Sequence, residues 1–209
     1  MTRCSRHAVL AGLLILAGGC GQTPGPAGTE IAGEETGDAA SGPTTADAAG
    51  PRYPAEAFFE TVTFRGAAFS HDGEHLLISS DQTGVFNVWQ VPFAGGEARP
   101  LTRSATESLF IADAFPDDGR FLYEADRGGD ELTHVYVRET DGTVLDLTPG
   151  ENLKAAFLGF SADGSSFWIT TNERDSRFFD LYEYAADDYE RRMLFRNDAS
   201  WSVQAVSPD

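Results

Sequence analysis

Short apolar runs alternate with polar turns along residues 53–209, as antiparallel strands alternate with hairpins. One turn phrase recurs at a nearly constant step. It occurs as Ser70-His71-Asp72-Gly73, Pro116-Asp117-Asp118-Gly119, Ser161-Ala162-Asp163-Gly164 and Ser207-Pro208-Asp209. Gly73 and Gly119 are 46 residues apart, and Gly119 and Gly164 are 45 residues apart. A step of this length is typical of a repeat of four short strands.

Each repeat contains four segments that alternate like strands. The first apolar run leads into the turn and the second leaves it. The third segment carries a polar residue and, two places later on the same face, an aromatic one. These pairs are Asn87 with Trp89, His134 with Tyr136, and Asp180 with Tyr182. The fourth segments end near Leu101-Thr102, Leu147-Thr148 and Met193-Leu194.

The pattern predicts an all-β fold, a partial β-propeller of three four-stranded blades. The blades are expected at about residues 61–104, 105–150 and 151–197, and the first strand of a fourth at 198–209. The last strand is expected near Ser202–Val206.

The recurring Asp-Gly pair has a geometric reason to stand in a hairpin. The Asp side chain accepts a hydrogen bond from a nearby backbone N–H, and Gly tolerates a positive φ. A calcium loop built from Asp113, Asp117 and Asp118 is the alternative, but the alternating ligands and the terminal Glu of such loops are missing. We therefore expect turns and no metal site.

Residues 1–20 have the features of a lipoprotein signal peptide. Basic residues precede an apolar run from Ala8 to Ala17, and small residues lead to Cys20. The run is shorter than the roughly 20 residues that a membrane-spanning helix needs. Lipid attachment at Cys20 would anchor the mature chain to a membrane. The alternative is a plain secretory signal, because Ala17 stands where such lipoprotein signals usually have Leu. Both predict an extracytoplasmic location, in the periplasm or at the cell surface.

Residues 21–52 consist mainly of Gly, Pro, Ala, Thr, Ser, Asp and Glu, with Ile31 as the one large aliphatic side chain. Such a segment cannot offset its ordering entropy, so we expect a disordered linker. The folded part is expected to begin at residue 53. Pro54 suits the first position of a helical turn, and residues 55–60 could pack Phe58 and Phe59 against the propeller.

The chain has 33 acidic and 15 basic residues and a formal net charge of −18. This balance argues against nucleic acid as a partner, and it does not identify a substrate. Cys4 and Cys20 are the two cysteines, and both precede the predicted repeats. The repeat region therefore contains neither a disulfide nor a thiolate metal site.

Catalytic patterns are missing from the repeats. The sequence has no Gly-x-Ser-x-Gly elbow. His71, His75 and His134 lack His or Cys neighbours at metal-ligand spacing, so we interpret them as structural residues. The three tryptophans are interpreted as core residues: Trp89, Trp168 and Trp201. No catalytic residue and no cofactor are predicted.

Two longer motifs carry a family resemblance. They are Asp126–Tyr136, which reads DRGGDELTHVY, and Thr171–Tyr182, which reads TNERDSRFFDLY. Both resemble the propeller of the prolyl oligopeptidase family of serine peptidases, in its dipeptidyl and acylaminoacyl peptidase branch. The resemblance covers about residues 53–209.

The resemblance implies a propeller that caps an α/β-hydrolase domain and admits only peptides to a Ser-Asp-His triad. That domain would lie beyond Asp209, so no catalytic residue is assigned to this chain. Asp130 and Glu131 do not match the paired glutamates that bind a substrate amine in some dipeptidyl peptidases. Two alternatives stay open: a TolB-like lipoprotein propeller that binds a protein partner, and a truncated product without function.

Overall fold

The structure is a computed structural model that describes residues 52–207. The predicted signal peptide, the linker and Cys20 lie outside the described residues. The described part contains one short 3-10 helix, η1 (Ala55–Phe58), and twelve strands. The strands are β1 (Phe64–Phe69), β2 (His75–Ser80), β3 (Asn87–Pro92), β4 (Arg99–Pro100), β5 (Phe110–Ala114), β6 (Phe121–Ala125), β7 (His134–Arg138), β8 (Val144–Asp146), β9 (Ala155–Phe160), β10 (Ser166–Asp175), β11 (Phe178–Ala185) and β12 (Arg191–Phe195).

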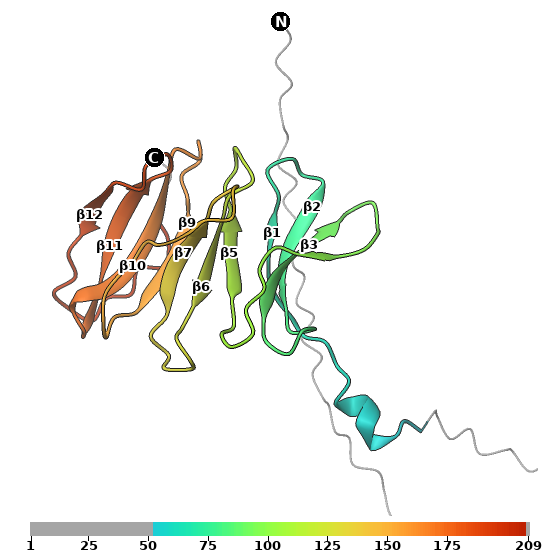
Figure 1. Ribbon diagram of the computed structural model, residues 1–209. Coiled ribbons are helices and arrows are strands. Elements are labelled where there is room, and N and C mark those ends of the chain that lie inside the picture. Colours follow the sequence, from blue (N-terminus) through green and yellow to red (C-terminus); the bar gives the residue numbers. More distant parts are fainter. Residues whose placement is uncertain (1–51, 208–209) are drawn as a thin grey trace, which may run out of the picture. The chain divides into compact units, whose positions relative to one another are not determined.

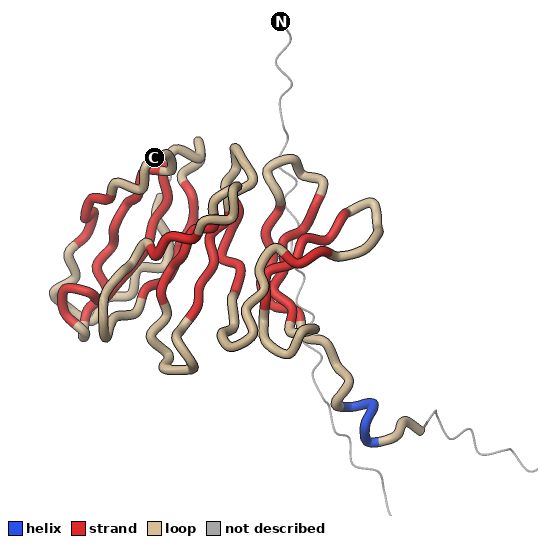
Figure 2. Tube along the Cα trace, viewed as in Figure 1, coloured by secondary structure: helices blue, strands red, loops and turns tan. Residues whose placement is uncertain are grey.

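The strands form three antiparallel sheets of four, as the repeat predicts. Their orders are β1-β2-β3-β4, β5-β6-β7-β8 and β9-β10-β11-β12. The sheets follow one another in chain order, each with its faces toward its neighbours (Figure 1). Strands and short connections account for nearly all of this region (Figure 2). The predicted all-β fold with three four-stranded blades is confirmed, and we call the sheets blades 1, 2 and 3.

The recurring turns join the first and second strands of each blade. In blade 1, the Asp72 carboxylate accepts hydrogen bonds from the Ser70 hydroxyl and the Glu74 N–H, and Gly73 has φ +69°. Blade 3 repeats this arrangement, with Gly164 at φ +74°. The Ser70 hydrogen bond, followed by that of the Glu74 N–H, lowers the pKa of Asp72 to about 2.

The turn of blade 2 departs from the prediction for glycine. Gly119 does not have a positive φ. Asp118 still closes the turn, because its Oδ1 accepts the Arg120 N–H at 2.8 Å, and Arg120 Nε also donates to its carboxylate. The aspartate is thus the shared element of the three hairpins, and the left-handed glycine occurs in two of them.

Two clusters of buried apolar side chains join the blades. The cluster between blades 1 and 2 contains Ala68, Leu77, Val88, Ile111, Ala114, Phe121, Tyr123 and Ala125. The cluster between blades 2 and 3 contains Phe115, Leu122, Val135, Val137, Leu147, Ala155, Phe167, Ile169, Tyr182, Tyr184 and Ala186. Burial of this apolar surface favours the stacking of one sheet on the next.

Aromatic rings dominate the second cluster. Phe167 is fully buried and stacks on Tyr184 with ring centroids 5.3 Å apart. Phe115 meets Phe167 edge to face at 5.8 Å, and the Arg120 guanidinium lies 4.1 Å from the Phe115 centroid. Such aromatic and cation–π contacts stabilise the interface beyond what the burial of apolar surface area contributes.

Two expectations at the C-terminal end of the folded part are wrong. Residues 196–207 contain no strand, so the first strand of a fourth blade, expected near Ser202–Val206, is not formed. A strand needs a neighbour for its backbone groups, and no described residue pairs with this segment. Trp201 was expected in a core but is 72% exposed, because no sheet covers that segment.

The helical turn before blade 1 is also different from the expectation. It is the single 3-10 turn η1, and Pro54 is its N-cap residue, not its first helical residue. Phe58 and Phe59 are exposed by 68% and 86%, so neither packs against the propeller. Four residues without a buried side chain give this turn little packing energy.

Replacement of Phe167 by Ala tests the core between blades 2 and 3. We expect a loss of about 3–5 kcal/mol in the free energy of unfolding, because the ring is fully buried and the cavity cannot close. Urea denaturation would measure it. The matched control is Phe59→Ala, whose ring is exposed and whose effect should stay within about 0.5 kcal/mol. Equal effects of the two substitutions would contradict this packing.

Candidate functional site

Each blade has a buried polar residue at or near the start of its third strand. Asn87, His134 and Asp180 are exposed by 1%, 3% and 0%. Burial of polar groups is costly unless they find partners. All three find them in the segment that follows the fourth strand of the same blade or at the end of that strand. We call this set the third-strand polar position.

In blade 1 the partners are a hydroxyl and the backbone. Asn87 Oδ1 accepts hydrogen bonds from the Thr102 hydroxyl at 2.9 Å and from the Ser104 N–H at 2.7 Å. The Thr102 hydroxyl oxygen in turn accepts the Val88 N–H at 2.8 Å. The amide of Asn87 also donates to the Ser104 carbonyl at 2.9 Å.

In blade 2 the partner is a carboxylate. His134 Nδ1 lies 2.9 Å from Asp146 Oδ2, at the end of β8. The other carboxylate oxygen accepts the Thr148 N–H, and the Thr148 hydroxyl accepts the Val135 N–H at 3.1 Å. The contact with Asp146 is consistent with a structural role for His134. The sequence pattern did not identify Asp146 as its partner.

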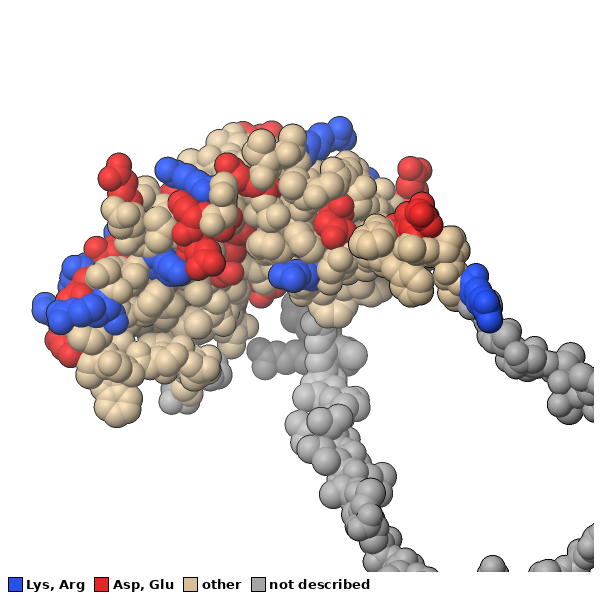
Figure 3. Space-filling model, turned by 90° about the horizontal axis from the view of Figure 1, so that it is seen from below, with Lys and Arg blue, Asp and Glu red and all other residues tan. Residues whose placement is uncertain are grey.

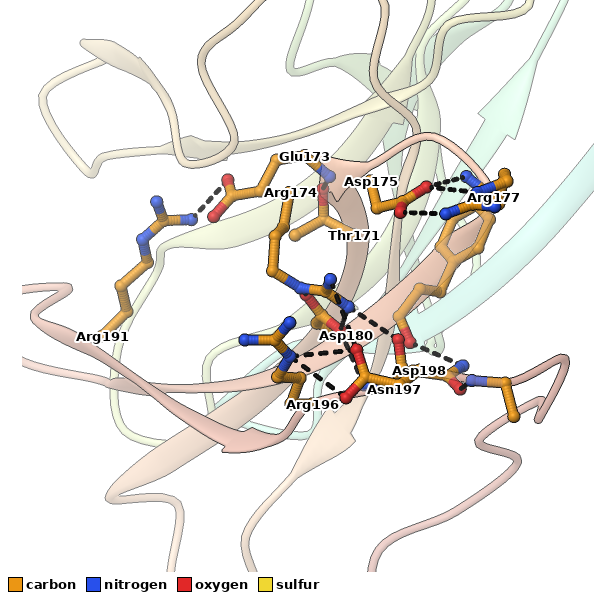
Figure 4. Close-up of polar contacts among 12 residues, drawn as sticks. Thr171, Glu173, Arg174, Asp175, Arg177, Asp180, Arg191, Arg196, Asn197 and Asp198 are labelled. Atoms are coloured by element: carbon orange, nitrogen blue, oxygen red, sulfur yellow. Dashed lines mark hydrogen bonds and ion pairs between the residues drawn. The ribbon is translucent and has the colours of Figure 1, made fainter.

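Blade 3 has the most charged version of this arrangement (Figure 4). Asp180 forms a bidentate ion pair with Arg174, with Nε–Oδ2 and Nη2–Oδ1 distances of 2.6 and 2.8 Å. Asp180 Oδ1 also accepts the Asn197 N–H at 2.7 Å. Arg174 Nη2 donates a hydrogen bond to the Asn197 carbonyl at 2.6 Å. The segment after β12 is thus held to the hairpin of β10 and β11.

Further ion pairs surround the Arg174–Asp180 pair, and Figure 4 shows them on the same side of blade 3. They are Glu173 with Arg191 at 2.9 Å, Asp175 with Arg177 at 2.8 Å, and Asp198 with Arg196 at 3.0 Å. Asp198 also lies 3.6 Å from Arg174. Each carboxylate of this group has an arginine beside it, so the group is balanced in charge.

The arginines stabilise the ionised form of the carboxylates. The hydrogen bonds from Arg174 hold the pKa of Asp180 below its ordinary value, and the Asn197 N–H acts in the same direction. Arg177 likewise holds the pKa of Asp175 well below its ordinary value. The favourable contribution of these pairs is present at neutral pH and is lost as the pH falls through the lowered pKa values.

The motif at residues 126–136 forms the corresponding hairpin of blade 2. Asp130 Oδ1 accepts the Leu132 N–H at 2.9 Å, and Asp126 accepts the Glu131 N–H at 3.2 Å. Glu131 has φ +61°, an unusual conformation for a residue with a side chain. A small cavity of about 220 Å³ lies beside this hairpin, with Arg127, Asp130 and His134 among its lining residues.

The arrangement can position and bind polar groups, but it lacks the parts of a nucleophilic centre. His134 is turned to Asp146, and no hydroxyl or thiol nucleophile contacts it in residues 52–207. His75 Nδ1 lies 3.7 Å from Asp72 Oδ1, beyond hydrogen-bond distance. Within the described part of the chain, no three His, Cys, Asp or Glu side chains gather at metal-binding distance.

The remaining aspartates and tryptophans have separate surroundings. Asp113 is half-buried, and burial raises the pKa of its carboxyl, whereas Asp118 pairs with Arg120. Trp89 and Trp168 are buried, as expected of core residues. The Nε1 atoms of both lack a hydrogen-bond partner among the described residues.

Charged side chains of both signs are interspersed on the face drawn in Figure 3. Over the described residues, no helix has the length and apolar character needed to cross a membrane.

The chain is similar in sequence to part of a peptidase. It is 30% identical over 149 residues to dipeptidyl aminopeptidase BIII of Pseudoxanthomonas mexicana, a match that covers 69% of this chain and 21% of that protein. It is 26% identical over 164 residues to a 6-phosphogluconolactonase of Serratia proteamaculans (strain 568), covering 74% of this chain and 44% of that protein. The chain thus spans less than half of either relative. No protein-family profile matches it.

Solved structures share the fold. A TolB structure from Agrobacterium tumefaciens has a TM-score of 0.51 at 20% identity, over 63% of this chain and 46% of that chain. A prolyl endopeptidase structure has a TM-score of 0.52 at 12% identity, over 65% of this chain and 22% of that chain. At these identities the likeness shows the propeller fold alone. With the dipeptidyl aminopeptidase match, it bears out the predicted resemblance to the propeller part of a prolyl oligopeptidase family peptidase.

Replacement of Asp180 by Asn tests the buried ion pair. We expect a loss of about 2–3 kcal/mol at pH 7, less than for a fully buried pair, because Arg174 is partly exposed and can turn to water. Since the pKa of Asp180 is lowered in the folded state, the difference from the wild type should shrink as the pH falls below about 4. Urea denaturation at several pH values would measure both effects.

The control for this substitution is Arg177→Ala, which removes an exposed ion pair. Its effect on the free energy of unfolding should be much smaller, because exposed ion pairs contribute little to stability. An Asp180→Asn effect as small as that of Arg177→Ala would show that the buried pair does not hold the segment after β12.

Proposed function

We propose that this chain is the substrate-gating propeller portion of an extracytoplasmic, lipid-anchored serine peptidase that acts on peptides. The observation that carries the proposal is the 30% identity with a dipeptidyl aminopeptidase over 149 residues. The motif at Thr171–Tyr182, which builds the ion-pair group of blade 3, is part of the resemblance on which the proposal rests.

In this proposal the propeller acts by restricting access and does no bond cleavage. The described residues offer a rigid framework of buried polar contacts and no nucleophile with a base beside it. The serine, aspartate and histidine of the triad would come from an α/β-hydrolase domain of the same enzyme. The propeller would then exclude folded proteins and admit short peptides.

The anchoring part of the proposal rests on the sequence of residues 1–20. Cys20 would carry the lipid after signal cleavage, and residues 21–52 would separate the propeller from the membrane surface. A flexible linker of 32 residues spans about 30 Å in the root-mean-square sense.

The peptidase proposal is tested on the native product. An antibody raised against the propeller would isolate that product from its source cells, and a fluorophosphonate probe would then label any activated serine. We expect a labelled polypeptide of about 70 kDa or more, the size of a propeller and a hydrolase domain together. It should also release chromophore from dipeptidyl substrates.

Two results would contradict the peptidase proposal. One is a native product that the probe does not label. The other is a labelled product that cleaves no dipeptidyl or acylaminoacyl substrate. An unlabelled product that instead retains an envelope protein would favour the TolB-like binding module.

Replacement of Cys20 by Ser tests the anchor. We expect the wild-type product to incorporate an alkyne-tagged palmitate and to sediment with membranes, and the variant to do neither. Cys4→Ser is the matched control, since the same position would be removed with the signal peptide and should change nothing. Equal lipid labelling of wild type and Cys20→Ser would exclude Cys20 as the attachment site.

A further inference from the structure

A cavity of about 630 Å³ lies between blades 1 and 2, beside the recurring turns of both blades. Its first wall consists of residues of blade 1, from residues 70–72 at the turn to Arg99 on β4. Its second wall consists of residues of blade 2, from residues 118–121 to Arg138 on β7. Both walls belong to complete four-stranded sheets. The volume is within the range of about 300–1,000 Å³ that is common for small-molecule sites.

Part of the lining of this cavity is apolar. Leu77 and Phe121 are buried members of the cluster between blades 1 and 2, and Leu101 is half-buried and packs against that cluster. All three line the cavity. The cavity therefore adjoins the apolar core, so an apolar group bound there would be removed from water.

The charged part of the lining is cationic on balance. It contains three arginines and two aspartates, together with His71 and His75. Asp72 is hydrogen-bonded within its own turn, and Asp118 pairs with Arg120. With neutral histidines the lining has one positive charge in excess, although the whole chain has a formal net charge of −18. A cationic cavity in so acidic a chain favours an anionic ligand over a cationic one.

Two of the arginines, one on each wall, have N–H groups without a protein partner. Arg99 Nε donates to Gln90 Oε1 at 2.6 Å, and its Nη1 and Nη2 atoms make no hydrogen bond or ion pair with residues 52–207. The Arg138 guanidinium lies 5.7 Å from the centroid of the Phe121 ring, and it makes no hydrogen bond or ion pair with that part of the chain either. Both guanidinium groups are therefore available as donors to a ligand.

We propose that this cavity binds a small organic carboxylate with an apolar body. The carboxylate accepts hydrogen bonds from Arg99 and Arg138, and the apolar body packs against Leu77 and Leu101. The planar fork of a guanidinium matches the geometry of a carboxylate. The one excess positive charge of the lining balances a carboxylate, whereas a phosphate monoester has almost two negative charges at neutral pH. The site does not depend on any peptidase activity.

Isothermal titration calorimetry on the native product, isolated with the antibody against the propeller, tests the proposal. Treatment with a fluorophosphonate first blocks any activated serine, so that a peptidase site does not contribute to the binding. We expect N-acetyl-L-phenylalanine to bind at one site per chain. N-acetyl-L-phenylalaninamide has the same apolar body without the negative charge, and its affinity should be lower by about 10-fold or more, because charged groups form the stronger hydrogen bonds.

Arg99→Ala and Arg138→Ala should each lower the affinity for N-acetyl-L-phenylalanine by roughly 10- to 100-fold. Arg103→Ala is the matched control, because Arg103 is an exposed arginine of blade 1 that does not line the cavity, and it should leave the affinity unchanged. Arg138→Ala also removes the contact with Phe121. Arg99→Ala changes an exposed residue, so its effect on binding is separate from any effect on folding.

Three results would overturn the proposal. They are a wild-type product that does not bind N-acetyl-L-phenylalanine, equal affinities for the acid and the amide, and Arg99→Ala and Arg138→Ala variants that bind as tightly as Arg103→Ala. Displacement of the probe by an equal concentration of inorganic phosphate would contradict the choice of a carboxylate with an apolar body. Failure of fluorophosphonate labelling would concern the peptidase proposal alone.

Discussion

The third-strand polar position fixes the path by which the chain leaves one blade and enters the next. Asn87, His134 and Asp180 are buried, and each holds the end of the fourth strand or the segment after it. The position of that segment determines where the next first strand begins, and hence how the next sheet packs. The chemistry differs between blades: an amide, an imidazole beside a carboxylate, and a carboxylate beside an arginine. In all three blades a buried polar side chain needs a hydrogen-bond partner, and it finds one at the end of the fourth strand or in the segment after it.

Much of the fold follows from the sequence because its signals are local and repeated. The turn phrases and the alternating apolar residues predict three sheets of four strands, since both depend on neighbours in the chain. The same turn phrase misleads at Gly119, where Asp118 and Arg120 close the turn without a left-handed residue. The turn phrase at Ser207 also predicts a preceding strand that is not formed, because a strand needs a neighbouring strand as well as a suitable sequence pattern.

The partners of the candidate site are harder to predict. His134, Asn87 and Asp180 occupy one position of the repeat, but Asp146, Thr102 and Asn197 differ in type and lie 12 to 17 residues further along. No fixed spacing reveals such pairs. The exposure of Trp201 is equally hard to predict from the sequence, because burial of an aromatic residue depends on whether a sheet lies opposite it. Composition and periodicity thus predict the four-stranded blades, but they do not predict the side-chain contacts between segments that lie far apart in the sequence.

The two apolar clusters have a consequence for cooperativity. One contains residues of blades 1 and 2 only, and the other residues of blades 2 and 3 only. Each blade is therefore stabilised by its sequence neighbours, and the stability of the array is close to a sum of nearest-neighbour terms, as in linear repeat proteins. Blade 2 has an interface on both sides, whereas blades 1 and 3 have one each among the described residues. Fraying should start at the outer sheets and reach the middle one last.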